Sequence, residues 1–146
     1  MRSRDVVQYL IDTAIIESSH ILVPEFEVVA LPRRNNNFMV FNPAGESVMV
    51  KQAVSADRAV TLAREAAAYR ALHGCGRPVP WLPRFHRYDE ADGLLVVGLR
   101  SDAVTMKQRV RVSGRVSRQT ATRFGAALAA VHAEPASIQP LSRPSS

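Results

Sequence analysis

The sequence predicts an α+β fold in which a five-stranded antiparallel sheet packs against a helix. Three short strand patterns follow one another between residues 26 and 52, a long helical run without internal Gly or Pro comes next, and two more strand patterns flank a turn at residues 89–93. We expect one further helix before the first strand and one after the last. With 146 residues, 47% of them apolar, the chain can bury a core as one domain.

The first half of the chain contains the pattern of one helix and three strands. Apolar residues at helical spacing predict a helix over residues 5–16. Strands are expected over residues 26–31, 38–41 and 48–52, with a turn at residues 42–46. Three short strands in succession indicate an antiparallel meander.

The second half predicts a long helix, a hairpin and a last helix. Ser55 or Asp57 would cap the long helix, which runs to His73 and stops at Gly74. Two strands, over residues 84–88 and 94–99, flank an acidic turn and form the hairpin. The last helix would be capped by Ser117 and carry an apolar stripe of Ala121, Phe124, Leu128 and Val131. We therefore assign residues 1–134 to one domain and the Pro- and Ser-rich residues 135–146 to a disordered tail.

Charge and cysteine content narrow the possible classes of protein. The net charge is +6, and its excess is concentrated late in the chain, at Lys107, Arg109, Arg111, Arg115, Arg118 and Arg123. A solvated basic face is the favoured interpretation, and nucleic acid is an unlikely partner because no aromatic residues are interleaved for base stacking. A single Cys75 excludes a disulfide framework. Without a membrane-length apolar run or a cleavable leader, we expect a cytoplasmic protein and no membrane partner.

The most informative pair of residues is Lys51, at the end of the third strand, and Glu65, on the long helix. Glu65 lies on the stripe expected to face the sheet, with Leu62, Tyr69 and Leu72. A half-buried carboxylate needs a cation, because otherwise it loses solvation or is driven to protonate. Lys51 is the cation that a strand can present to this face. The alternative is that Glu65 reaches water at the edge of the stripe and pairs with Arg58 or Arg64.

The order of these elements resembles the N-terminal lobe of the aminoglycoside phosphotransferase and choline kinase superfamily, a protein-kinase-like group that phosphorylates small molecules. The resemblance covers residues 5–133. The segments that carry it are residues 34–40, 48–51, 64–72, 82–85 with 94–100, and 124–133. The expected fold is therefore the small lobe of a kinase-like protein, with an added N-terminal helix and one C-terminal helix.

The resemblance implies a nucleotide site. Lys51 would contact the α- and β-phosphates, and Glu65 would hold it in place. A turn containing Asn35, Asn36 and Asn37 would cover the phosphates, although a hairpin turn without a ligand explains the same residues. Backbone groups of the next strand end would meet the adenine edge, at Val97, Gly98 and Leu99. ATP is the implied cofactor, weakly bound, and magnesium would be present only with the nucleotide.

The catalytic residues of that superfamily have no counterpart in the sequence. The His-Gly-Asp run that supplies the catalytic Asp does not occur, and neither does the later Asp that binds magnesium, so we assign no catalytic or metal-binding residue. We expect a truncated or split phosphotransferase that is inactive alone. Its partner would be a separate large-lobe chain or a second copy, docked on an apolar face near Phe124 and Leu128. The alternatives are a non-catalytic protein-interaction module and a basic nucleic-acid-binding protein.

Overall fold

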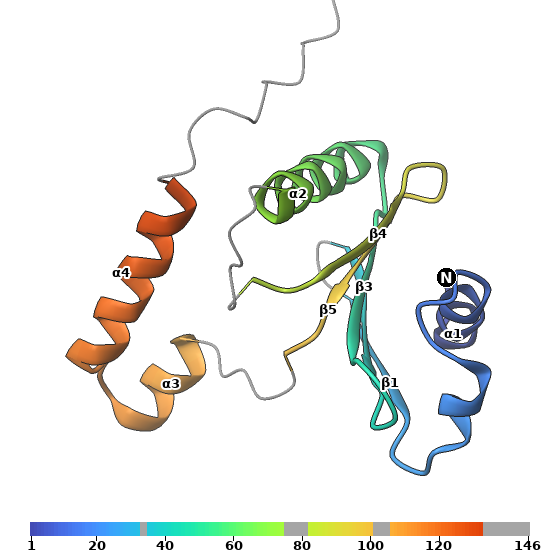
Figure 1. Cartoon of the computed structure of the whole chain (residues 1–146), viewed down its shortest axis with the longest axis horizontal. Coiled ribbons are helices and arrows are strands. Elements are labelled where there is room, and N and C mark those ends of the chain that lie inside the picture. The colour runs from blue at the N-terminus through green and yellow to red at the C-terminus, as the bar shows by residue number, and fades with distance from the viewer. Residues whose placement is uncertain (33–34, 75–81, 101–105, 133–146) are drawn as a thin grey trace, which may run out of the picture.

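The structure is a computed structural model, which describes residues 1–32, 35–74, 82–100 and 106–132. Its elements in chain order are α1 (Ser3–Asp12), the short 3-10 helix η1 (Ser18–Leu22), β1 (Glu27–Pro32), β2 (Asn36–Phe41), β3 (Val48–Gln52), α2 (Ala56–Gly74), β4 (Phe85–Asp89), β5 (Leu94–Gly98), α3 (Met106–Ser113) and α4 (Arg118–His132). The strands form one sheet in the order β1-β2-β3-β5-β4, with every neighbouring pair antiparallel (Figure 1). The predicted α+β class, the meander and the hairpin are confirmed.

The first helix, α1, is shorter than the predicted helix over residues 5–16. It ends at Asp12, and Ala14 then adopts a left-handed conformation with φ of 55°, which ends the helical path. The turn brings Ile16 back towards the helix, so that its N–H donates to the Leu10 carbonyl oxygen at 3.2 Å. Ile16 is buried in the same core as Leu10. Ile16 therefore packs into the core from a turn after α1 and not from the helix itself.

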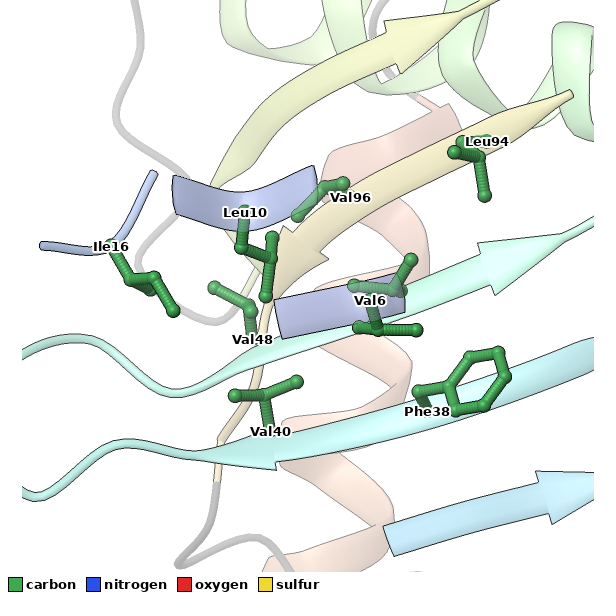
Figure 2. Packing of buried hydrophobic residues seen from close by; sticks show 9 residues of the cluster. Val6, Leu10, Ile16, Phe38, Val40, Val48, Leu94 and Val96 are labelled. Carbon is green, nitrogen blue, oxygen red and sulfur yellow. The ribbon is translucent and has the colours of Figure 1, made fainter. Parts of the chain in front are cut away.

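Helices cover the two faces of the sheet, α1 one face and α2 the other (Figure 1). Figure 2 shows the core under α1, which is built from Val6, Leu10, Ile16, Phe38, Val40, Val48, Val50, Leu94 and Val96. The core under α2 is smaller and consists of Leu62, Ala66, Leu95 and Val97, with Met49, Ala53, Tyr69, Phe85 and Tyr88 packed against it. Alternate residues of one strand thus belong to different cores, because successive side chains point to opposite faces.

Strand β5 shows the effect of this double coverage most clearly. All five of its residues are buried. Leu94 and Val96 contribute to the core under α1, whereas Leu95 and Val97 contribute to the core under α2. A strand buried on both faces has no position that favours a polar residue, which explains its continuous apolar sequence.

The long helix α2 begins and ends where the sequence predicts. The Arg58 N–H donates to Ser55 Oγ at 3.4 Å, as expected for the predicted cap, and the helix ends at Gly74. Near its end, His73 Nε2 accepts a hydrogen bond from the Phe85 N–H at 3.2 Å. This bond ties the end of α2 to the start of β4, the edge strand of the sheet.

The C-terminal part contains a helix that the sequence pattern does not reveal. Ser117 caps α4 as predicted, accepting a hydrogen bond from the Thr120 N–H at 3.2 Å. Helix α3 was not predicted, because its described side chains are exposed and show no apolar stripe. Gly114, with φ of 68°, follows α3 and provides the left-handed turn that separates it from α4. The predicted tail, residues 135–146, lies outside the described residues.

Membrane-spanning helices were not expected from the sequence. Among the described residues, no helix combines the length and the apolar character needed to cross a bilayer.

Replacing Leu62 with Ala should lower the free energy of unfolding by about 2–5 kcal/mol, because the change opens a cavity in a packed core. Leu62 is fully buried in the core under α2. Val60→Ala on the same helix is the matched control: Val60 is 53% exposed, so we expect a change within about 0.5 kcal/mol. Urea unfolding followed by circular dichroism measures both. Equal losses would contradict the assignment of the buried face of α2.

Candidate functional site

Lys51 and Glu65 form an ion pair between β3 and α2. Lys51 Nζ lies 2.5 Å from Glu65 Oε1, and the side chains are 24% and 33% exposed, respectively. The prediction that the two residues lie within ion-pair reach is confirmed, and Glu65 pairs with Lys51 rather than with Arg58 or Arg64. The alternation of β3 explains the geometry: Val50 points into the core under α1, so its neighbour Lys51 points towards α2.

The ammonium group of Lys51 is held by Glu65 and still has N–H donors for a ligand. An ammonium group has three N–H donors, and the hydrogen bond to Glu65 uses one of them. The side chain of Lys51 also lines a cavity of about 530 Å³, within the range usual for small-molecule sites. The pair therefore positions a cation at the wall of a cavity that is large enough for a ligand.

The wall of this cavity is mostly apolar. Its lining residues come from β1, β2, β3, α2, β5, α3 and the segments next to β4 and β5: Leu31, Met39, Phe41, Met49, Lys51, Tyr69, Pro83, Val97, Gly98, Leu99, Arg100 and Gln108. The cations of this lining are Lys51 and Arg100, and its polar uncharged side chains are those of Tyr69 and Gln108. Such a site suits a ligand with an apolar body and an anionic group.

The strand register explains how the lining residues come together. Met39 pairs with Met49, and Met49 pairs with Val97, so three side chains form one row across β2, β3 and β5. Lys51 lies two residues after Met49 on the same face, beside this row. The sequence analysis assigned no role to either methionine. Met49 precedes Lys51 by two residues in one strand, and this spacing is the signal that predicts a shared face. Met39 joins them only through the pairing of β2 with β3.

Tyr69 adds an aromatic wall and a hydroxyl group. It lies one helical turn after Glu65 on α2, and its ring stacks on Phe85 with centroids 6.5 Å apart. Burial, and secondarily the nearby charge of Glu65, raises the pKa of Tyr69 above its usual value of 10.0. The phenol is therefore neutral at physiological pH and can act as a hydrogen-bond donor.

The end of β5 lies at the cavity, as predicted, but two of its N–H groups are already used. Val97, Gly98 and Leu99 all line the cavity. The Gly98 N–H donates to the Arg84 carbonyl oxygen, and the Leu99 N–H donates to the Ser47 carbonyl oxygen, each at 2.7 Å. These two donors hold neighbouring strands together, so the predicted contact with a ligand edge would be left to the other backbone groups of this strand end.

Gly98 lies against the carboxylate of Glu46, from the turn between β2 and β3. A Cβ atom at this position would meet this carboxylate, and the flexible Glu46 side chain would have to move. Glu46 Oε2 lies 3.4 Å from Arg84 Nη1 and 3.2 Å from His86 Nε2. The sequence pattern did not indicate a role for Glu46.

The three asparagines do not line the cavity that contains Lys51. Asn36 and Asn37 belong to β2, which begins two residues earlier than predicted, and only Asn35 lies before the strand. Asn36 Nδ2 donates to Gln52 Oε1 at 3.5 Å, and Asn37 pairs with Lys51 across the sheet. Asn36 and Asn37 line a separate cavity of about 320 Å³ next to the start of α1. The preceding residues, 33 and 34, lie outside the described part of the chain.

The predicted apolar face is exposed only in part. Phe124 and Leu128 on α4 are 55% and 45% exposed, as predicted. Leu95 and Val97 of β5 are buried, because α2 covers this side of the strand.

Within the part of the chain that the structure describes, no group of three or more His, Cys, Asp or Glu side chains is arranged to hold a metal ion. A scan of protein-family models, a search of curated proteins and a search of solved structures each found no match to this chain. The assignment of function therefore depends on the site itself.

A double-mutant cycle of Lys51→Met and Glu65→Gln should give a coupling free energy of about 0.5–1 kcal/mol, because the pair is short but partly solvated. The coupling should decrease at high salt. Urea unfolding of the four proteins at low and high ionic strength measures it. A coupling of zero at low salt would show that the pair does not form in solution.

Proposed function

We propose that the cavity beside Lys51 binds a nucleotide, with ATP as the first candidate, and that the chain does not transfer phosphate by itself. One observation carries the proposal: a lysine held by a glutamate at 2.5 Å lines an apolar cavity of about 530 Å³ at the end of a central strand. Nucleotides combine a flat apolar base with a strongly anionic phosphate chain. The two parts of the cavity wall correspond to these two parts of the ligand.

The apolar part of the wall supports binding of the base. Met39, Met49 and Val97 provide a continuous row, and Leu31 and Leu99 line the same cavity. Methionine side chains are polarisable and adapt to the faces of aromatic rings. Because the Gly98 and Leu99 N–H groups are used within the sheet, the base would be recognised mainly through its faces. We therefore expect weak discrimination between adenine and other bases.

The charged part of the wall supports binding of the phosphates. The position of Lys51 is fixed by Glu65, and an ammonium group acts as a point charge towards phosphate oxygens. Glu65 limits the entropy that the lysine loses when a ligand binds, because its side chain is already held. Arg100 lines the same cavity and adds a second positive charge. Magnesium would arrive with the nucleotide.

Phosphate transfer needs groups that residues 1–146 do not supply. The sequence contains no His-Gly-Asp segment to position an acceptor hydroxyl. A second chain carrying such groups would complete the reaction, and the substrate class would be small molecules with a hydroxyl group, as the resemblance implies. The proposed activity of this chain alone is nucleotide binding.

The second candidate function is a protein-interaction module without a nucleotide. The exposed Phe124 and Leu128 on α4 favour it, because apolar side chains on one helix face commonly mark a contact surface. The two candidates differ in which residues matter. Nucleotide binding depends on Lys51, whereas docking depends on α4.

Lys51→Met should weaken binding of Mg-ATP about 10- to 100-fold, the effect of losing one charge-assisted hydrogen bond to phosphate. Arg87→Met is the matched control: it removes one positive charge from β4, and its side chain does not line the cavity. Equilibrium dialysis with labelled nucleotide compares the three proteins. Equal affinity of the Lys51→Met variant and the original chain would contradict the proposed phosphate contact.

Purified protein should show no ATP hydrolysis or phosphate transfer above the background of its Lys51→Met variant. Absence of a positioned catalytic base alone typically lowers the rate about 10²- to 10⁴-fold, and missing metal ligands and acceptor positioning lower it further. Release of labelled phosphate measures the rate. Robust turnover that Lys51→Met abolishes would demonstrate a complete active site and contradict this part of the proposal.

A further inference from the structure

The net charge of the protein resides on one helical segment. Residues 106–132, which contain α3 and α4, carry six of the 19 Lys and Arg residues and none of the 13 Asp and Glu residues. The rest of the chain is therefore balanced in charge, and the net charge of +6 belongs to this segment. So uneven a distribution creates a strong local field.

Four arginines of this segment, Arg111, Arg115, Arg118 and Arg123, are exposed and have no ion-pair partner among the described residues. We call the surface that they form the basic helical face. The same segment exposes five apolar side chains: Val110, Val112, Val116, Phe124 and Leu128. Val112 is 90% exposed, which is unusual for a valine in a helix. Arginines mixed with apolar residues are typical of protein contact surfaces.

A surface of the opposite charge lies where the β4–β5 turn meets the start of α2. Asp57, Glu90 and Asp92 are exposed there and have no ion-pair partner among the described residues, and we call this surface the acidic tip. The Ala53 N–H donates to the Gly93 carbonyl oxygen at 3.0 Å and thereby holds the two segments together.

The acidic tip also has exposed apolar residues, and few cations compensate its charge. Val54 and Val60 are both more than half exposed. Arg87 is already paired, with Asp89 at 3.9 Å, and Arg58 is half-buried. Like the basic helical face, the acidic tip therefore combines uncompensated charge with apolar surface.

The two surfaces lie apart within one molecule. The acidic tip lies at the start of β5 and the helical segment follows its end, so the strand separates them, as Figure 1 shows. A five-residue strand alone spans about 17 Å, which is longer than the screening length of about 8 Å at physiological salt. In this arrangement each surface is open to a second molecule.

We propose that the chain associates head to tail, with the acidic tip of one copy docked on the basic helical face of the next. The contact brings Asp57, Glu90 and Asp92 against the exposed arginines and buries Val54 and Val60 against Phe124 and Leu128. It is heterologous, because different surfaces of the two copies meet, and it therefore propagates into a ring or an open chain. The contact goes beyond nucleotide binding and does not depend on it, since none of these residues lines the Lys51 cavity.

Charge and apolar surface together favour a second copy over nucleic acid or an anionic membrane. A nucleic acid would neutralise the arginines but leave Phe124 and Leu128 without apolar contacts, and it makes no use of the acidic tip. An anionic membrane would repel Glu90 and Asp92. A second copy is the partner for which both charged surfaces, and the apolar residues beside each, have a counterpart in the structure.

The first test measures the mass of the full chain by sedimentation equilibrium over a wide range of concentration. We expect the average mass to rise above the monomer value of 16.0 kDa with concentration and to fall towards it as salt is added. A monomer at every concentration and at low salt would overturn the proposal, even if the protein then bound vesicles or oligonucleotides.

The second test mixes two variants that are each defective on one surface. Arg115→Ala with Arg118→Ala disables the basic helical face, and Glu90→Ala with Asp92→Ala disables the acidic tip. Each variant alone should be monomeric. Because each retains the surface that the other lacks, an equimolar mixture should form a dimer that cannot grow further.

Arg4→Ala with Arg64→Ala is the matched control for the arginine variant, since it removes the same two positive charges at exposed positions outside both surfaces. This control should associate as the original chain does, and circular dichroism verifies that all variants are folded. A mixture that stays monomeric would overturn the head-to-tail geometry. Dissociation of the control to the same extent would show that only net charge matters and would also overturn it.

Discussion

The register of β3 is the constraint on which the rest of the structure depends. Its alternate residues serve two different layers, with Val48 and Val50 under α1 and Met49 and Lys51 towards α2. A slip of one residue would exchange these sets and place the lysine ammonium group among buried aliphatic side chains. The chain therefore has one acceptable register. The same register aligns Met39, Met49 and Val97 into the row that lines the cavity.

The ion pair between Lys51 and Glu65 contributes little to the stability of the fold. Both side chains retain access to water, and partly solvated pairs of this kind contribute at most about 1 kcal/mol. The fold therefore does not depend on a lysine at this position, whereas the proposed phosphate contact does.

The molecule separates its candidate functions in space. The cavity lies between the sheet and α2, close to the end of β5, and its charge is a fixed lysine with one acidic partner. The basic helical face and the acidic tip lie at opposite ends of the same strand and carry uncompensated charge. The proposed binding in the cavity and the proposed association of copies therefore depend on different residues and should respond differently to salt, because exposed charges are screened more strongly than partly buried ones.

Local patterns were enough to predict most of the elements and the central pair. The apolar stripe of α2 identified the sheet-facing side of Glu65, and the position of Lys51 at the end of a strand identified its partner. Capping residues also predicted helix ends, as Ser55 and Ser117 show. Each of these inferences needs only the spacing of nearby residues, which a helix or strand converts directly into a shared face. The exposed helix α3 has no such spacing, and the sequence analysis missed it.

Only the tertiary structure decided what surrounds the pair. The resemblance implies that a turn containing the asparagines covers the phosphates, with a hairpin turn without a ligand as the alternative, and pairing with β1 and β3 draws Asn36 and Asn37 into β2. The sequence does not show where the Gly98 and Leu99 N–H groups donate, and in the structure they donate to the carbonyl oxygens of Arg84 and Ser47. These outcomes depend on strands that meet across the order β1-β2-β3-β5-β4, between residues far apart in the chain. The sequence thus determined which elements form and which face each buries. Long-range strand pairing determined which polar groups are used within the sheet. The sequence does not reveal this pairing, because hydrogen bonds between strands are made by backbone atoms that every residue shares.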